Sequence, residues 1–360
     1  LWSQSGSLDT SGVFAHARRS VTEVIDAASV RLVSSHRHAD RVDFTKGSGA
    51  VLSFIRNRTG SGALAGSSLG LDPQQVAHEL GFINDVTFDA HIGRILSTLS
   101  TVDLFDRAAF NRIYDAKTGR MVDNASKISN VGAGWSSVDL GRLLIWLRII
   151  SSKYPKFSPM AAQVVRRIDM SKVLRDGYLQ GVDVDPKTGK RQVFTETEIG
   201  YQQYALTGFA LWGARVNPEG LDVRNDVRDV NVLGVRVLTD SRGNDRVMSE
   251  PYIMLGLEPG YRSAELRREA GQVLAAQAAR YQRTRIVTAP SEDAMPDPPW
   301  YFYYYSIYHR GKTFGVEGVG DKAYVEKPRW VSSKAAFGWN AVLPSAYTQL
   351  VLRTVQPAGT

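Results

Sequence analysis

The sequence contains no cysteine, which excludes disulfide bonds and thiolate metal sites. It has no apolar run long enough to span a membrane. It also lacks a Gly-rich phosphate loop, a dinucleotide fingerprint, an HExxH metal pair and a Gly-x-Ser-x-Gly elbow. We therefore expect no cofactor, no bound metal and no transmembrane segment in this chain.

The composition is that of an ordinary globular protein, with 43% hydrophobic and 22% charged residues in 360. The formal net charge is +8, but the basic residues are interleaved with acidic ones and form no long run. This pattern favours a solvated basic surface over a nucleic-acid partner, and leaves an anionic polysaccharide or an acidic membrane face open. The chain begins at Leu1 without a signal peptide, so we expect a processed or trimmed N-terminus.

Apolar residues at helical spacing predict a mainly α-helical fold. The clearest helix covers Ser136–Ile150, where Ser136 and Asp139 form a capping box. A second capping box, Thr195 with Glu198, predicts a helix that begins at Thr195. Further helices are expected over residues 12–33, 88–99, 105–114, 160–174, 263–281 and 333–351.

Strand signals are fewer. Residues 178–194 read as a hairpin around Asp185–Gly189, and 230–238 as a short strand. The Gly- and Ser-rich stretch 46–70 reads as a long loop. Because strands do not alternate with helices, a doubly wound sheet is unexpected. No Pro, Gly and Ser linker divides the chain, so we predict one domain over residues 1–360, all-α with short β-hairpin insertions.

Acidic residues next to aromatic ones recur at the predicted helix starts. A single acid there is explained by the helix dipole and by capping of free N–H groups. Together, such acids could flank a glycosidic bond, whose cleavage needs one protonated and one ionised carboxyl group. The acids are Asp89, Asp139, Glu196, Glu198, Glu292 and Asp293, and the aromatic residues that could stack on sugars are Trp135, Tyr201, Trp300, Tyr301 and Tyr303.

These same residues lie in segments that resemble a bacterial family called domain of unknown function 3131, found in envelope and secreted proteins. The matching segments are Phe88-Asp89, Ser136–Leu144, Glu198–Ala205, Pro251–Glu258, Thr288–Asp293 and Ser333–Trp339. That family is similar in turn to bacterial glucoamylase-like proteins, including β-1,2-glucanases. The resemblance implies an (α/α)6 toroid and a carbohydrate-active role.

The glucoamylase-like pattern has Ser-Ser-x-Asp at the start of an inner helix, then Tyr-x-Glu, then Ser-Glu. Asp139 matches the first motif and Glu292 the third. Gln203 occupies the Glu position of the second, and an amide cannot act as acid or base. Glu198, one turn earlier, could substitute for it.

The sequence thus predicts a periplasmic or secreted bacterial glycoside hydrolase acting on a glucan or envelope polysaccharide. Glu198 or Glu292 would be the general acid and Asp139 the general base, with inversion favoured. The residues predicted to bind substrate are Asp89, Trp135, Tyr201, Asp293, Trp300 and Tyr303. Two alternatives stay open: a non-catalytic polysaccharide-binding protein, suggested by Gln203, and a polysaccharide lyase acting on uronates. The sequence does not indicate an oligomeric state.

Overall fold

The computed structural model describes residues 61–63, 71–79, 81–115, 118–125, 127–222, 227–241, 245–291, 293–294, 301–318, 324–326 and 330–355. These residues form two compact units. We call the described residues within 39–196, with Ala205–Leu221, the N-terminal unit, and Thr197–Tyr204 with those within 222–360 the C-terminal unit. The predicted helix over 12–33 lies outside the described residues, and the assignment of one domain to 1–360 stays a prediction.

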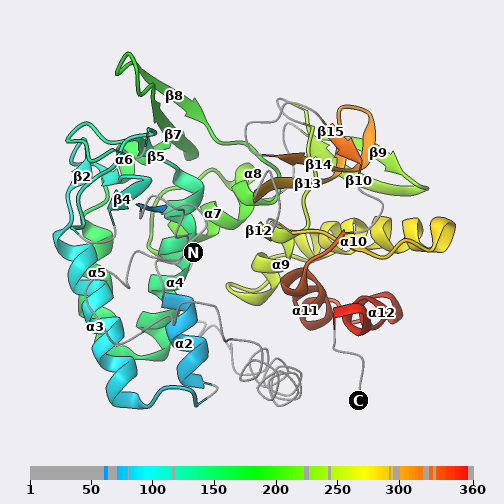
Figure 1. Ribbon diagram of the computed structural model, residues 1–360, viewed down its shortest axis with the longest axis horizontal. Coiled ribbons are helices and arrows are strands. Elements are labelled where there is room, and N and C mark those ends of the chain that lie inside the picture. The colour runs from blue at the N-terminus through cyan, green and yellow to red at the C-terminus, as the bar shows by residue number, and fades with distance from the viewer. Residues whose placement is uncertain are drawn as a thin grey trace, which may run out of the picture. The chain divides into compact units, whose positions relative to one another are not determined.

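The N-terminal unit is built on helices (Figure 1). They are α2 (Leu71–Glu79), α3 (Asp85–Thr101), α4 (Ser137–Lys153), the 3-10 turn η2 (Pro155–Phe157), α5 (Ser158–Arg166), α6 (Met170–Val173), α7 (Tyr201–Leu211, which enters this unit at Ala205) and α8 (Pro218–Leu221). The strands are β1 (Ser61–Ala63), β2 (Leu104–Phe105), β3 (Ala109–Phe110), β4 (Ile113–Asp115), β5 (Gly134–Trp135), β6 (Leu174–Arg175), β7 (Tyr178–Val184) and β8 (Arg191–Thr195).

Helix α4 is the centre of the N-terminal unit. Ser136 is its N-cap, as predicted, and the Ser136 hydroxyl oxygen accepts a hydrogen bond from the Asp139 N–H. The apolar residues at helical spacing are buried, and so are three on other sides of the helix. The first set is Leu140, Leu143, Leu144, Leu147 and Ile150, and the second is Ile145, Trp146 and Ile149. A helix that is apolar on most of its sides is surrounded by protein, which places α4 in the core.

Two glycines allow α7 to cross α4 at backbone distance. A Cβ atom added at Gly141 would lie 2.4 Å from the Cα of Ala205, and one added at Gly208 would lie 2.1 Å from the carbonyl oxygen of Gly141. Both separations are far shorter than a van der Waals contact. The close crossing therefore depends on glycine at both positions.

Strands β5, β6, β7 and β8 form a small antiparallel sheet with β7 paired to the other three. The predicted hairpin of residues 178–194 is confirmed by the pairing of β7 with β8. The helix predicted over 105–114 is wrong, because β2 and β3 form a hairpin there. Asp106 and Arg107 both have positive φ, 50° and 55°, which makes the tight turn and ends any helix.

The C-terminal unit combines helices with antiparallel strands. Its helices are α9 (Glu250–Leu257), α10 (Ala264–Thr284), α11 (Ser333–Val342) and α12 (Ala346–Val355), together with Tyr201–Tyr204 of α7. Its strands are β9 (Val227–Val232), β10 (Val235–Asp240), β11 (Thr288–Ala289), β12 (Asp293–Ala294), β13 (Tyr301–His309), β14 (Lys312–Gly318), β15 (Tyr324–Glu326) and β16 (Trp330–Val331).

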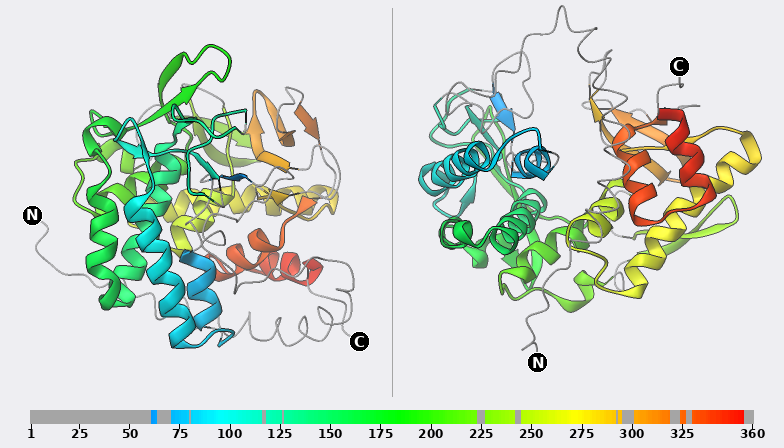
Figure 2. Two further views of the ribbon diagram at one scale, coloured as in Figure 1. Left: turned by 60° about the vertical axis from the view of Figure 1, so that its left-hand side comes forward. Right: turned by 90° about the horizontal axis from the view of Figure 1, so that it is seen from below.

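Helix α10 lies along the β9–β10 hairpin, and α11 packs on both α9 and α12 (Figure 2). Strands β12 to β15 form one antiparallel sheet in chain order. The predicted helix over 263–281 is confirmed by α10, whose N-cap is Ser263. The helix predicted over 333–351 is instead two helices, α11 and α12, separated by Leu343, Pro344 and Ser345, because Pro344 lacks the N–H that a continuous helix needs.

The described chain is mainly helical, as predicted, but it contains more strand pairs than the hairpin insertions that we expected. Most of these pairs have two or three residues on each side and connect helices. Strands this short do not show the alternation of apolar and polar residues by which strands are detected in a sequence.

Candidate active site

The start of α4 brings two carboxyl groups together in the N-terminal unit. Asp139 lies in the first turn of the helix. The side chain of Glu196 reaches the same turn, where its Oε2 accepts hydrogen bonds from the N–H groups of Ser137, at 2.6 Å, and Val138, at 3.1 Å. The hydroxyl of Ser136 also hydrogen-bonds the Glu196 carboxyl group. Ser136 therefore connects the two acids, since its oxygen accepts from the Asp139 N–H.

The surroundings of Glu196 favour its protonated form. Burial of the carboxyl group raises the pKa of Glu196 to about 7, and the nearby charge of Asp139 acts in the same direction. The hydrogen bonds from Ser136 and from the N–H groups of Ser137 and Val138 oppose the shift without cancelling it. As a whole residue Glu196 is half-buried. At neutral pH it can hold a proton and release it.

Strand β8 and its neighbour β7 position Glu196. Glu196 directly follows the last residue of β8, and its own N–H donates to the carbonyl oxygen of Leu179 in β7. The same strand holds the helix start, because the Ser137 hydroxyl lies 2.5 Å from the carbonyl oxygen of Gln180. Strand β7 thus holds both Glu196 and the start of α4, which carries Asp139.

The predicted helix start at Thr195 is wrong. Thr195 ends strand β8, where its hydroxyl accepts a hydrogen bond from the Gln180 amide, and α7 begins only at Tyr201. The side-chain oxygen of Gln203 accepts from the Gly200 N–H at 2.7 Å and satisfies the first turn instead. Gly200 has φ of +88°, a conformation that a side chain disfavours. A capping-box pattern is present in the sequence, but the chain turns at glycine before the helix starts.

Glu198 lies in the C-terminal unit, 3.7 Å from the guanidinium of Arg246.

In that unit, Glu250 at the start of α9 accepts a hydrogen bond from the Ser291 hydroxyl at 2.6 Å and lies 3.3 Å from the Lys334 ammonium group. The Glu250 carboxylate therefore lies where three of the segments that resemble the family meet. These segments begin at Pro251, Thr288 and Ser333.

The aromatic residues predicted to bind sugars are mostly core residues where they are described. Trp135 is 5% exposed; its indole N–H donates to the Gln180 carbonyl oxygen, and its ring packs edge-on against Phe105. Tyr201 is 8% exposed. Neither presents a free ring face, because aromatic surface in a folded chain is first used for packing.

The structure does not bring Asp89 to Asp139. Asp89 pairs with Lys156, which follows the C-terminal end of α4, whereas Asp139 lies at its N-terminal end. The roughly fifteen intervening residues of helix span about 22 Å. Asp89 and Asp139 therefore lie near opposite ends of α4, and the role of Asp89 in binding substrate stays a prediction. Its Oδ1 atom is buried and has no hydrogen-bond partner among the described residues.

The remaining predicted site residues are not described as side chains. Glu292 and Trp300 lie outside the described residues. Asp293 and Tyr303 lie in β12 and β13 and are described by their backbone alone. Their predicted roles, and the roles of Glu198 and Asp139, stay predictions.

Sequence reasoning named Glu196 among the acids near helix starts but gave it no catalytic role, and it missed Glu250. Glu196 was visible only as one of two acids near a helix start, and nothing in the sequence indicates that it turns back onto α4. The sequence does contain a signal for Glu250, because an acid directly before proline often marks the first turn of a helix.

Within the described part of the chain, no three His, Cys, Asp or Glu side chains are grouped so that they could hold a metal ion. No helix there has both the length and the apolar character needed to cross a membrane.

Solved structures with a similar fold include two candidate glucoamylases and a glucanase. A candidate glucoamylase from Bacteroides caccae matches with a TM-score of 0.56 at 15% identity, covering 84% of this chain and 75% of that one. One from Bacteroides fragilis matches at 0.54 and 13% identity, covering 98% and 82%. An endo-β-1,2-glucanase from Chitinophaga pinensis, solved with sophorotriose and glucose, matches at 0.53 and 16% identity, covering 82% and 72%. This chain therefore shares the overall fold of these solved structures.

Residues 60–359 match the model of the family described as protein of unknown function (DUF3131), and the chain belongs to this family. No curated protein matches the sequence. The resemblance seen in the sequence segments is therefore confirmed, and the match covers all of the described residues.

Proposed function

We propose that this protein is a glycoside hydrolase that acts on a bacterial glucan or envelope polysaccharide in the periplasm or outside the cell. The glucoamylase-like fold supports the class of reaction. The observation that carries the proposal is the pair of carboxyl groups at the start of α4, of which Glu196 has a pKa of about 7. An (α/α)6 toroid is the arrangement of helices that we propose for the whole chain.

The two acids have complementary tasks in this mechanism. Protonated Glu196 donates its proton to the glycosidic oxygen as the bond to the anomeric carbon breaks. Asp139 accepts a proton from water, whose oxygen forms the new bond to that carbon. An inverting reaction of this kind places the two carboxyl groups about 6.5–9.5 Å apart. Glu198 and Glu292 remain the rival proton donors that the sequence predicts.

The test is release of reducing ends from a panel of glycans that includes β-1,2-glucan. We expect Asp139→Asn and Glu196→Gln each to lower kcat by about a thousand-fold or more, since each removes one partner of acid–base catalysis. In Glu196→Gln the amide oxygen can still accept hydrogen bonds from the N–H groups of Ser137 and Val138. This variant therefore keeps the contact with the start of α4 and loses only the ionisable carboxyl group.

Asp169→Asn is the matched control. Asp169 caps α6 in the same unit, and Asn caps a helix equally well. Full activity of Glu196→Gln, with activity lost in Glu198→Gln or Glu292→Gln, would transfer the acid role to that residue. Cleavage that survives Asp139→Asn would reject this site.

A second candidate function is polysaccharide binding without cleavage. It is favoured by Gln203, whose amide occupies the position of a glutamate in related proteins and here serves the first turn of α7. Calorimetric binding of an oligosaccharide that is never cleaved, over the same panel, would identify this function.

A further inference from the structure

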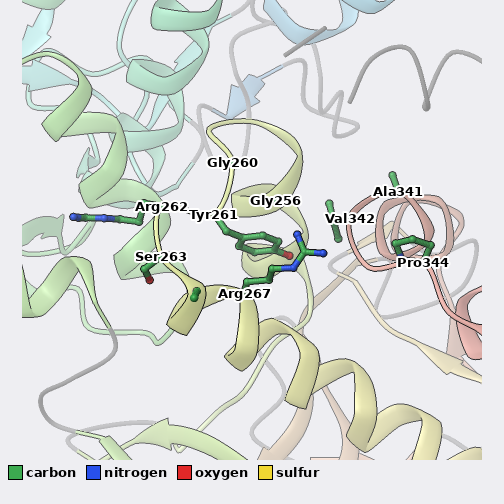
Figure 3. A pocket seen from close by; sticks show the side chains of 10 residues that line it. Gly256, Gly260, Tyr261, Arg262, Ser263, Arg267, Ala341, Val342 and Pro344 are labelled. Carbon is green, nitrogen blue, oxygen red and sulfur yellow. The ribbon is translucent and has the colours of Figure 1, made fainter. Parts of the chain in front are cut away.

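A cavity of about 540 Å³ in the C-terminal unit has no role in the proposed reaction. It lies between the loop that joins α9 to α10 and the end of α11 (Figure 3). The residues around it include Gly256, Tyr261, Arg267, Val342 and Pro344. Pockets of this size accommodate small organic ligands such as one or two sugar rings.

The floor of the cavity is closely packed. The Tyr261 hydroxyl donates to the carbonyl oxygen of Tyr252 at 2.9 Å, which fixes the ring. A Cβ atom added at Gly256 would lie 2.8 Å from that hydroxyl and 2.7 Å from Val342, so α9, the ring and α11 are in close contact. Gly260, with φ of +78°, makes the turn before Tyr261 and has open space beside it.

Two arginines line this cavity, Arg262 and Arg267. The guanidinium of Arg267 lies between the Tyr261 ring and Val342, whereas the side chain of Arg262 points away from the ring (Figure 3). Arg267 is exposed, has no ion pair within the described residues, and no described residue that lines the cavity is acidic. Its neighbour Arg268 is different, because it lies 3.3 Å from Glu265 and 3.6 Å from Glu269.

We propose that this cavity binds a sugar residue carrying an oxyanion, either a carboxylate or a phosphate. Arg267 binds the oxyanion through charge-assisted hydrogen bonds, for which the guanidinium fork is suited. The fixed Tyr261 ring, with Val342 and Pro344, contacts the sugar. The choice of a sugar, rather than another ring, rests on the proposed function. The two sources of oxyanion are an acidic sugar unit of a polysaccharide and a phosphorylated one.

The test measures binding to the full chain by calorimetry with four probes: glucuronate, glucose 6-phosphate, glucose and inorganic phosphate. We expect one of the two anionic sugars to bind at least ten-fold more tightly than both glucose and inorganic phosphate. Glucuronate as the tighter ligand indicates a uronate source, and glucose 6-phosphate a phosphorylated one. The variant Arg267→Gln should weaken this binding at least ten-fold, and Arg268→Gln, one residue away on α10, should leave it unchanged.

The proposal is overturned if neither anionic sugar binds more tightly than glucose, or if Arg267→Gln binds as the wild type does. The same measurement on Asp139→Asn separates this proposal from the catalytic one. If Asp139→Asn still binds the anionic sugar, binding at the cavity is independent of catalysis. In that case, a wild type that cleaves no glycan would reject the proposed hydrolase activity and leave the proposed binding site standing.

Discussion

Glu196 is the residue whose chemistry depends most on the fold. In an unfolded chain its carboxyl group would be ionised at neutral pH, because the ordinary pKa of a glutamate is 4.5. Burial beside Asp139 raises the pKa to about 7. The sequence suggests an acid in this region, but a pKa is set by neighbours that lie far away along the chain.

The free energy of unfolding should respond to this shift. Because the folded-state pKa of Glu196 lies above the unfolded value, its contribution is fully present below pH 4.5 and is lost as the pH rises through about 7. The loss amounts to about 3 kcal/mol at most. Urea unfolding between pH 4 and 8 measures it. Glu196→Gln should remove this component and be more stable than the wild type at pH 8, and an unchanged pH profile would contradict the raised pKa.

Activity should have a matching dependence on pH. If Glu196 is the proton donor, kcat/KM falls as the pH rises above about 7, because the donor loses its proton. The pH profile of kcat/KM on whichever glycan the panel identifies gives this limb. An activity that stays constant from pH 6 to pH 9 would assign the proton to another group.

At the scale of elements, the crossing of α4 and α7 is the most sensitive contact. Gly141→Ala would place a methyl group 2.4 Å from the Cα of Ala205, so the helices must separate. We expect a loss of about 2–3 kcal/mol in the free energy of unfolding, as in overpacked cores. Thermal and urea unfolding measure it.

Gly93→Ala in α3 is the control for this substitution. Gly93 has no atom within 4 Å of an added Cβ. Alanine there should stabilise the protein by about 0.5–1 kcal/mol, since glycine in a helix costs backbone entropy. Equal effects at Gly141 and Gly93 would mean that the helices do not cross closely.

Helices with several apolar residues at helical spacing were predictable, as α3, α4 and α10 show. The positions at which helices are interrupted could not be predicted. Residues 105–114 have helical composition, yet Asp106 and Arg107 turn the chain into a hairpin. At α7 the capping-box residues precede a glycine turn, and tertiary contacts decide where the helix begins.

At the scale of the whole molecule, the chain passes from the N-terminal unit to the C-terminal unit at Thr197, returns at Ala205 and leaves again at Asp222. The segment Thr197–Tyr204 therefore belongs to a unit that is completed only by later residues. Tyr204 is fully buried, and its hydroxyl donates to the Glu258 carboxylate.

A fragment that ends at Leu221 should consequently fold poorly. It would lack Glu258 and also Pro251, which packs on Gly200, so Tyr204 and the start of α7 would be exposed. We expect the fragment to bind an apolar dye strongly and to unfold without a sharp transition, whereas the full chain does neither. Cooperative unfolding of the fragment without dye binding would show that the segment does not need the later residues.

Four features could be predicted from the amino-acid sequence: the family, the mainly helical fold, the capped start of α4 and the acids near helix starts. These follow from local patterns, such as periodicity, capping and short motifs, that residues a few positions apart can express. Three features depend on the packing of distant segments: Glu196 reaches the first turn of α4, Trp135 is a core residue, and Asp89 lies near the other end of α4. The physical reason is that burial and long-range contact depend on how distant segments pack, which no local pattern encodes.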